Sequence, residues 1–342
     1  MALLSTMRRE IDQQPATLDR TFRDLRQPAA EARAMIDARR SVLFFARGTS
    51  DTATTYGRYL FEIVGGRCTS SGSPSVATLY GATLDLCDTT AIFVSQSGCT
   101  AELIDTAAWA RRCGAATVAV SNTPGSPLVD VCDLALVTSA GPEQAVPATK
   151  SHTAQLLAMA MLTSPRWDAE LAALGATISD LLEHLAELPS LEEATSLLAA
   201  SQSIVCVGRG YSLASAQESA LKLEETIGQV CLGLSAADFQ HGPMAVLGRH
   251  TPLLTFVPPD GPCVTGLEHV EALAQQRGSP VVRIGGAAVH GTRHIPAGQL
   301  SEEISPIGLS IVGQVLAENT ARARGVDSDE PHGLTKVTQT LQ

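Results

Sequence analysis

The sequence predicts an α/β protein made of two doubly wound parallel sheets in tandem, with a helical N-terminal arm and an irregular C-terminal tail. Three observations lead to this prediction. The chain repeats itself at an offset of 162 residues, short apolar strands alternate with amphipathic helical stretches in both copies, and 342 residues suffice for two domains that each bury a core.

The repeat is clearest in two apolar runs that end in Arg-Gly-x-Ser, SVLFFARGTS from residue 41 and SIVCVGRGYS from residue 203. Each run is typical of a strand, a tight turn and a helix N-cap. Further pairs follow at the same offset, the last with a shift of one or two residues: Glu62 and Glu224, Ser73 and Ser235, 91–98 and 253–260, and 117–122 and 280–286. Several matches in order indicate an internal duplication.

Amphipathic stretches at 51–64, 100–113, 212–228 and 264–277 predict helices between the strands of each copy. Alternation of this kind favours βα units and a parallel sheet. The expected division of the chain is a helical arm (1–38), a first lobe (39–165), a helical connector (166–200), a second lobe (201–326) and a tail (327–342).

Composition and charge argue against several classes of function. The net charge of −11 disfavours binding to nucleic acid or to an acidic membrane surface, because the field repels polyanions. The eight cysteines form no C-x-x-C pair and no metal-ligand spacing with histidine, so we expect reduced thiols and no metal or other cofactor. The sequence shows no basic-then-apolar leader and no run of about 18 apolar residues, so we expect a cytoplasmic protein.

The strongest local signal in the first lobe is the run SQSGCT at 95–100, which follows an apolar strand and precedes a helix. At such a junction the amides of the helix N-terminus and nearby hydroxyl groups converge, which suits a phosphate group. Ser95, Ser97 and Thr100 are therefore candidate phosphate ligands. The alternative is that Ser97 or Thr100 serves only as a helix N-cap.

The turn Arg47-Gly48-Thr49-Ser50 is a second strand-to-helix junction of the same lobe. In a parallel sheet both junctions open on the same carboxyl edge, so Thr49 and Ser50 can face the same ligand. The alternative is a turn and a cap, with Gly48 supplying a permissive backbone and Arg47 forming only an ion pair.

The second copy has lost these hydroxyl groups. At the positions of Ser95, Ser97 and Thr100 it carries a valine and two prolines, whose side chains donate no hydrogen bond. Conversely, it carries Lys222 and Glu225 one turn apart on a helix, where the first copy has aliphatic residues. The simplest account is that the first lobe binds phosphate and the second supplies acid–base groups to one shared site. The alternative for Lys222 and Glu225 is a surface ion pair.

Two further residues are candidates for acid–base or carbonyl chemistry. His241 lies in the run DFQHGP, where Pro243 suits the first turn of a following helix and keeps the histidine in a loop. Lys336 lies in the tail, where a lysine is usually exposed. If it folds back over the pocket, its amine could form a Schiff base with an open-chain sugar carbonyl. The other seven histidines, His332 in the tail among them, are read as ordinary surface or cap residues.

Six motifs, in order along nearly the whole chain, resemble those of a known family: R-G-T-S (47–50), S-Q-S-G-x-T (95–100), P-A-T-K (147–150), A-L-K-L-E-E (220–225), H-G-P (241–243) and L-T-K (334–336). This is the double-SIS family, whose two flavodoxin-like SIS domains form the isomerase half of glucosamine-6-phosphate synthase and the SIS-type glucosamine-6-phosphate deaminases. The resemblance implies the same fold here.

The resemblance also implies roles for individual residues. Thr49, Ser95, Gln96, Ser97 and Thr100 would hold the sugar phosphate, helped by the backbone near Val146. Glu225 would move a proton between C1 and C2 with Lys222 beside it, and Lys336 would contact or condense with the open-chain carbonyl. His241 would open the sugar ring, contributed from the neighbouring subunit of a homodimer.

The sequence departs from the synthase pattern at two positions, with Cys99 in place of an acidic residue and Ala148 in place of a serine that contacts the sugar. Roughly 40 residues precede the first strand, so we expect no glutaminase domain of the synthase type. The endings K-V-T-x-T-L and R-G-T-S-D resemble the stand-alone deaminases more closely. Aldose–ketose interconversion also needs one positioned carboxylate, which Glu225 can supply.

The sequence thus favours an aminosugar-phosphate deaminase that converts glucosamine 6-phosphate and water to fructose 6-phosphate and ammonia. An alternative is a deglycase or isomerase of another 6-phosphosugar, such as an Amadori compound. A third reading is a sensor that binds a sugar phosphate without turnover. It is disfavoured because the chain has no DNA-binding helix-turn-helix and keeps the candidate catalytic residues.

Overall fold

The computed structural model describes residues 4–331 and 333–336, and they form two compact lobes, each with its own sheet. His332 and the K-V-T ending beyond Lys336 lie outside the described residues. The first lobe takes in Ala16–Glu143 and Lys150–Ala173 with Thr335 and Lys336, and the second takes in Gln144–Thr149 and Leu174–Leu334 with the described residues up to Pro15. The five-part division expected from the sequence stays a prediction.

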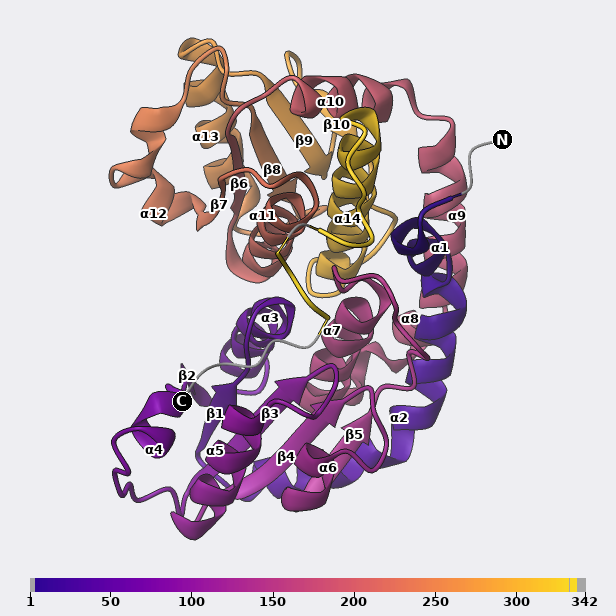
Figure 1. Ribbon diagram of the computed structural model, residues 1–342. Coiled ribbons are helices and arrows are strands. Elements are labelled where there is room, and N and C mark those ends of the chain that lie inside the picture. Colours follow the sequence, from indigo (N-terminus) through magenta and orange to yellow (C-terminus); the bar gives the residue numbers. More distant parts are fainter. Residues whose placement is uncertain (1–3, 332, 337–342) are drawn as a thin grey trace. The chain divides into compact units, whose positions relative to one another are not determined.

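The first lobe is a parallel five-stranded sheet in the order β2-β1-β3-β4-β5 (Figure 1). Helices α3 and α7 pack together on one face, and α5 packs with α4 and α6 on the other. Its elements are α2 (Gln14–Asp37), β1 (Ser41–Phe45), α3 (Thr49–Ile63), β2 (Cys68–Ser71), α4 (Pro74–Thr78), β3 (Thr89–Ser95), α5 (Ala101–Arg112), β4 (Ala116–Ser121), α6 (Pro127–Val131), β5 (Leu134–Val137), α7 (Lys150–Thr163), η1 (Pro165–Trp167) and α8 (Asp168–Ala172).

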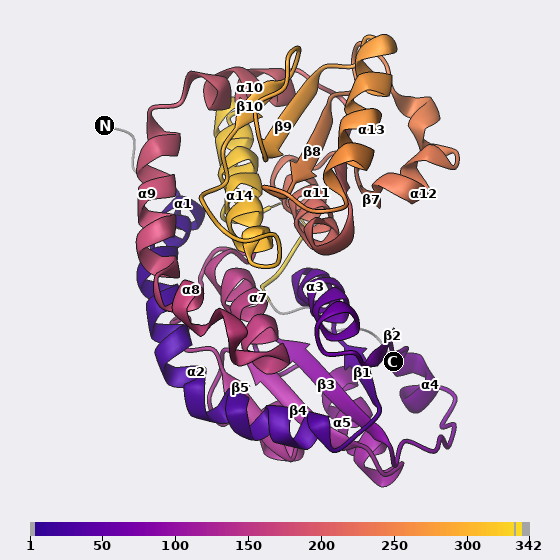
Figure 2. The ribbon, with the colours of Figure 1, turned by 180° about the vertical axis from the view of Figure 1, so that it is seen from behind.

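The second lobe repeats this order, because β7-β6-β8-β9-β10 is again a parallel sheet whose first strand lies inside it (Figure 2). Helices α11 and α14 pack together, as do α12 and α13. Its elements are α1 (Thr6–Asp12), α9 (Leu174–Ala186), α10 (Pro189–Ala199), β6 (Ile204–Gly208), η2 (Gly210–Ser212), α11 (Leu213–Ile227), β7 (Cys231–Ser235), α12 (Ala236–Gln240), η3 (Pro243–Val246), β8 (Leu253–Val257), α13 (Val264–Gln276), β9 (Val281–Gly285), β10 (Arg293–Ile295) and α14 (Ser305–Ala323).

The shared strand order confirms the predicted fold class. In both lobes the chain moves from the first strand to the strand on one side, then crosses to the other side of the sheet. The turn equivalences hold as well, since Ser73 and Ser235 are the N-caps of α4 and α12. The arm is helical as expected, the connector contains α9 and α10, and the tail contains no helix or strand among its described residues from 327 to 336.

The central strands form because their side chains are apolar on both faces and are covered by helices. Strand β3 is buried over all but its first residue, and Phe93 on it stacks against Phe45 of β1 with ring centroids 4.8 Å apart. In the second lobe β8 is buried throughout. In the part of the chain that the structure describes, no helix combines the length and apolar character needed to cross a membrane.

Candidate functional site

The two predicted phosphate junctions of the first lobe lie at the switch point of its sheet. Strands β1 and β3 are neighbours, and the connections that leave them run in opposite directions to β2 and β4. Ligands of open α/β sheets bind at this point, outside the carboxyl ends of the strands. The structure therefore brings the 47–50 turn and the 95–100 loop together at one edge of the sheet. We call these two segments the cradle.

The 95–100 loop has a defined backbone shape. The Gly98 N–H donates to Ser95 Oγ at 3.1 Å, and the Cys99 N–H donates to Ser97 Oγ at 3.2 Å. Gly98 has φ of +64°, and a Cβ there would overlap the side chain of Ser126, so this position requires glycine. The buried Ser126 hydroxyl beneath the loop was not predicted from the sequence.

The hydroxyl groups of the cradle differ in how far they are engaged. Thr100 is the N-cap of α5, yet its side chain makes no capping hydrogen bond, so the capping role considered for it is wrong. Thr49 begins α3 after Gly48, two residues earlier than the sequence suggested. Ser50 is buried, and its Oγ accepts a hydrogen bond from Gln155 Nε2 of α7 at 3.1 Å. Ser50 is thus held from behind by a residue that sequence analysis missed.

Arg47 forms the ion pair that sequence analysis had considered for it. Its guanidinium contacts the Glu102 carboxylate through Nε at 3.2 Å and Nη2 at 2.9 Å. Glu102 lies in the first turn of α5, so this pair joins the two segments of the cradle. It also neutralises a carboxylate next to a helix N-terminus that would otherwise repel a phosphate.

The equivalent edge of the second lobe is closed to phosphate. The loop after β8 contains three prolines, and a Cβ on Gly261 would overlap the carboxylate of Glu302, which lies against this loop. Burial, together with Glu303 and Asp260, raises the pKa of Glu302. A site that already holds a poorly stabilised carboxylate does not favour a second anion.

Helix α11 of the second lobe carries a buried charged cluster. Lys222 has no exposed side-chain area and contacts the Glu225 carboxylate, whose side chain is 21% exposed. Lys222 Nζ also lies 3.7 Å from Oε1 of the fully buried Glu218. The surface ion pair considered from the sequence is therefore wrong. Glu218 was missed, although its spacing of four residues from Lys222 was a visible signal.

His241 and Val146 belong to loops of the second lobe. His241 is exposed and follows α12 as its C-cap, and η3 begins at Pro243 as the sequence suggested. The Val146 N–H donates to the Asp329 carbonyl at 2.9 Å, which leaves the Val146 carbonyl as the backbone group for a ligand. Within the described residues no group of three or more histidine, cysteine or acidic side chains has the arrangement of a metal site.

Lys336 is not a freely exposed tail lysine. Its side chain is 24% exposed, and Nζ lies 3.0 Å from Oε2 of Glu143, whose side chain is completely buried. Sequence analysis missed Glu143. Nothing local marks it, because its partner lies 193 residues further along the chain.

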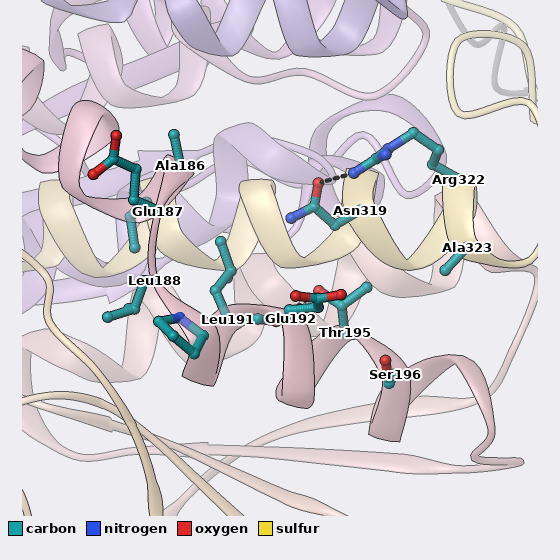
Figure 3. A pocket seen from close by; sticks show the side chains of 12 residues that line it. Ala186, Glu187, Leu188, Leu191, Glu192, Thr195, Ser196, Asn319, Arg322 and Ala323 are labelled. Carbon is teal, nitrogen blue, oxygen red and sulfur yellow. Dashed lines mark hydrogen bonds between the residues drawn. The ribbon is translucent and has the colours of Figure 1, made fainter. Parts of the chain in front are cut away.

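The marked surface hollows of the second lobe do not contain the predicted residues. Figure 3 shows one of about 500 Å³ lined from α9, α10 and α14, where Arg322 donates to Asn319 Oδ1 at 3.1 Å. Another of about 920 Å³ lies beside α9 and the loop 296–300. Neither includes a predicted catalytic or phosphate-binding residue.

Comparison with known proteins agrees with this architecture. The SIS domain model matches residues 34–165 and 197–286. The glutamine–fructose-6-phosphate aminotransferase of Methanothermobacter thermautotrophicus is 31% identical over 356 aligned positions, which cover 96% of this chain and 56% of that protein. The chain thus spans about half the length of this curated relative.

Solved structures match along the whole chain. A protein of Silicibacter pomeroyi, provisionally assigned as a phosphosugar isomerase, has a TM-score of 0.85 at 30% identity over 95% of this chain and 100% of its own. The glucosamine-6-phosphate deaminase of Thermotoga maritima has a TM-score of 0.77 at 22% identity over 98% and 100%. The second match shows a common fold. From the matched domain model and these relatives, the chain belongs to the SIS-domain family.

Proposed function

We propose that this chain is an aminosugar-phosphate deaminase that converts glucosamine 6-phosphate and water to fructose 6-phosphate and ammonia. The observation that carries the proposal is the buried Lys222–Glu225 pair on α11. A buried lysine is costly unless its charge is used or compensated, and the pair leaves part of one carboxylate accessible. The similarity to phosphosugar enzymes supports the choice of substrate class.

In the proposed reaction the phosphate binds to the cradle of the first lobe. The hydroxyl groups of Ser97 and Thr100 and the amides at the start of α5 are suited to a dianion. The Arg47–Glu102 pair keeps the neighbouring carboxylate neutralised. Because the second lobe offers no comparable anion site, the substrate phosphate has one preferred place.

Glu225 carries the proton transfer. After ring opening, its carboxylate removes the proton from C2 and returns it to C1, which converts the aldehyde and amine into a 2-imine. Water adds to this imine, ammonia leaves, and fructose 6-phosphate remains. The Lys222 ammonium beside Glu225 supplies a fixed positive charge, and the Lys336 amine is assigned to the open-chain carbonyl. The proposal requires both sets of residues to act on one substrate molecule.

Ammonia and fructose 6-phosphate, measured together after incubation with glucosamine 6-phosphate, test the proposal. We expect equal release of both, reduced by about 10²–10⁴-fold in Glu225→Gln because general acid–base catalysis is lost. Glu224→Gln is the matched control, since that exposed carboxylate on the same helix only accepts from the Cys231 N–H in the contacts given for it. No release, with binding retained in a thermal-shift assay, would overturn the deaminase.

The proposal includes a homodimer in which His241 opens the sugar ring for the partner subunit. Mixing inactive Glu225→Gln with inactive His241→Ala tests this. If His241 acts across the dimer, half of the dimers are mixed and each has one intact site, so about a quarter of the activity returns. No recovery after subunit exchange would show that His241 acts within its own subunit or not at all.

A further inference from the structure

The chain uses lysine sparingly. Lysine occurs three times, at positions 150, 222 and 336, and arginine supplies the rest of the 24 basic side chains. Lys150 and Lys222 are buried, and Lys336 is the lysine with measurable side-chain exposure. Arginine provides a permanent charge, whereas lysine provides a compact amine. In a chain that favours arginine so strongly, Lys336 stands out as a site for amine chemistry.

Lys336 contacts a carboxylate that is already held in place. Glu143 lies between β5 and α7, and it accepts the Ser151 N–H at 3.1 Å and the Ser151 hydroxyl at 2.6 Å. Ser151 is in the first turn of α7, where the helix dipole favours a negative charge. The carboxylate is thus fixed by the helix independently of the tail. Its contact with Lys336 Nζ at 3.0 Å adds a third donor.

This geometry determines where the Lys336 amine lies. A buried carboxylate is stabilised by a cation, and a charge-assisted hydrogen bond near 3 Å is strongly directional. The neighbouring tail residues 333–335 are exposed and have no helix or strand to hold them. The Glu143 contact is therefore the main recorded restraint on the Lys336 side chain.

We propose that Glu143 is a positioning residue that fixes the Lys336 amine for its contact with the open-chain carbonyl. The proposal rests on the proposed function for the role of the amine, but the geometry can be tested without turnover. Glu143 itself is not assigned any contact with substrate.

Reductive methylation of the native protein, read by peptide mass spectrometry, tests the geometry. Besides the α-amino group, Lys336 is the accessible amine, while Lys150 and Lys222 are buried internal controls. We expect Glu143→Gln, which keeps the side-chain size, to raise Lys336 methylation about fivefold because a charge-assisted contact is lost. Glu143→Asp shortens the side chain by one methylene and should give an intermediate rise. It also serves if Glu143→Gln does not fold.

Kinetics then separate positioning from general structural support. We expect Glu143→Gln to lower kcat more than it changes KM. In a Lys336→Met background it should cause no further loss, because Glu143 would act only through the amine. Lys336→Arg keeps a cation for Glu143 and should fold well while remaining slow.

Two results would overturn the positioning role: unchanged methylation of Lys336 in both Glu143 variants, or a loss in the double variant that adds to that of Lys336→Met. If the wild-type protein releases no ammonia from glucosamine 6-phosphate, the proposed function fails, and the methylation result still decides the role of Glu143. The two failures are therefore distinguishable.

Discussion

Arg47 and Glu102 form a two-point ion pair that joins the turn after β1 to the first turn of α5, with N–O distances of 2.9 and 3.2 Å. Glu102 is nearly buried, whereas the Arg47 side chain is 52% exposed. The second lobe keeps an arginine at the position of Arg47 but has Val264 at the position of Glu102. The pair therefore occurs in the lobe whose switch point retains the hydroxyl groups.

This arrangement predicts that Arg47→Met weakens phosphosugar binding. The change releases one segment of the cradle and leaves the Glu102 carboxylate unneutralised beside the phosphate. Because the pair is half exposed, we expect a modest effect of about fivefold in Kd. The measurement is calorimetric binding of glucosamine 6-phosphate in the Glu225→Gln background, where turnover is slow.

The double variant Arg47→Met/Glu102→Gln separates the two causes. Removal of the carboxylate should restore part of the affinity, since it removes the repulsion but not the loss of the ion pair. Unchanged binding in Arg47→Met, or a double variant that binds no better than it, would contradict this account.

The fold was largely predictable because it depends on local periodicity and on the repeat. Apolar strands and amphipathic helices appear directly in the sequence, and the offset of 162 residues aligned Ser73 with Ser235, which prove to be equivalent caps. Helix bounds differ by one or two residues, as at Thr49, where the positive φ of Gly48 lets α3 begin at once.

Contacts between distant residues were not predictable. Glu143 was missed because its partners are α7 and a residue in the tail, and Glu302 was missed because it meets Gly261 through a loop. The burial of Lys222 escaped prediction for a similar reason. It depends on α11 packing along α14, where Gly313 allows Ser219 to approach closely.

Cys99 should report on occupancy of the cradle. It is exposed within the 95–100 loop, whereas burial raises the pKa of Cys132 and of Cys231 to about 12, which keeps both as unreactive thiols at neutral pH. We expect iodoacetamide to label Cys99, and a phosphosugar at ten times its Kd to slow this labelling by about tenfold through mass action. Peptide mass spectrometry measures each site.

Cys68 is the matched control, because it is exposed on β2 outside the cradle. Its labelling should not respond to the ligand. Equal labelling of Cys99 with and without phosphosugar, under conditions where calorimetry detects binding, would place the phosphate elsewhere.

Glu302 should lower stability at neutral pH. Its pKa is raised from 4.5 by burial and by neighbouring carboxylates, so the folded state holds this proton more tightly than the unfolded chain does. Between the two pKa values the free energy of unfolding therefore falls as pH rises, and the penalty is complete above the folded-state pKa. We expect Glu302→Gln to raise Tm at pH 7 and to have little effect at pH 4.

Glu183→Gln, an exposed change on α9, controls for the loss of one negative charge. An equal rise in Tm for both variants would show a general effect of net charge. A larger effect of Glu302→Gln at pH 4 than at pH 7 would reverse the sign and refute the argument.

The core of the second lobe contains an ion pair at a place where the first lobe is apolar. Arg283 of β9 is buried and contacts Glu271 of α13 at 2.7 Å, while Thr255 of β8 donates to the same carboxylate at 2.5 Å. At the 162-residue offset Thr255 and Glu271 correspond to Phe93 and Trp109, which lie in the apolar core.

Because removal of one partner strands a buried charge, we expect Arg283→Met to lower the free energy of unfolding by about 3–5 kcal/mol. The double variant Arg283→Met/Glu271→Leu removes both charges and recreates an apolar core like that of the first lobe. It should recover most of the loss, because a well-packed apolar replacement of a buried pair costs little. Calorimetric unfolding of the single and double variants measures this. A double variant as unstable as Arg283→Met would mean that the ion pair itself stabilises the second lobe, beyond the cost of leaving one charge without its partner.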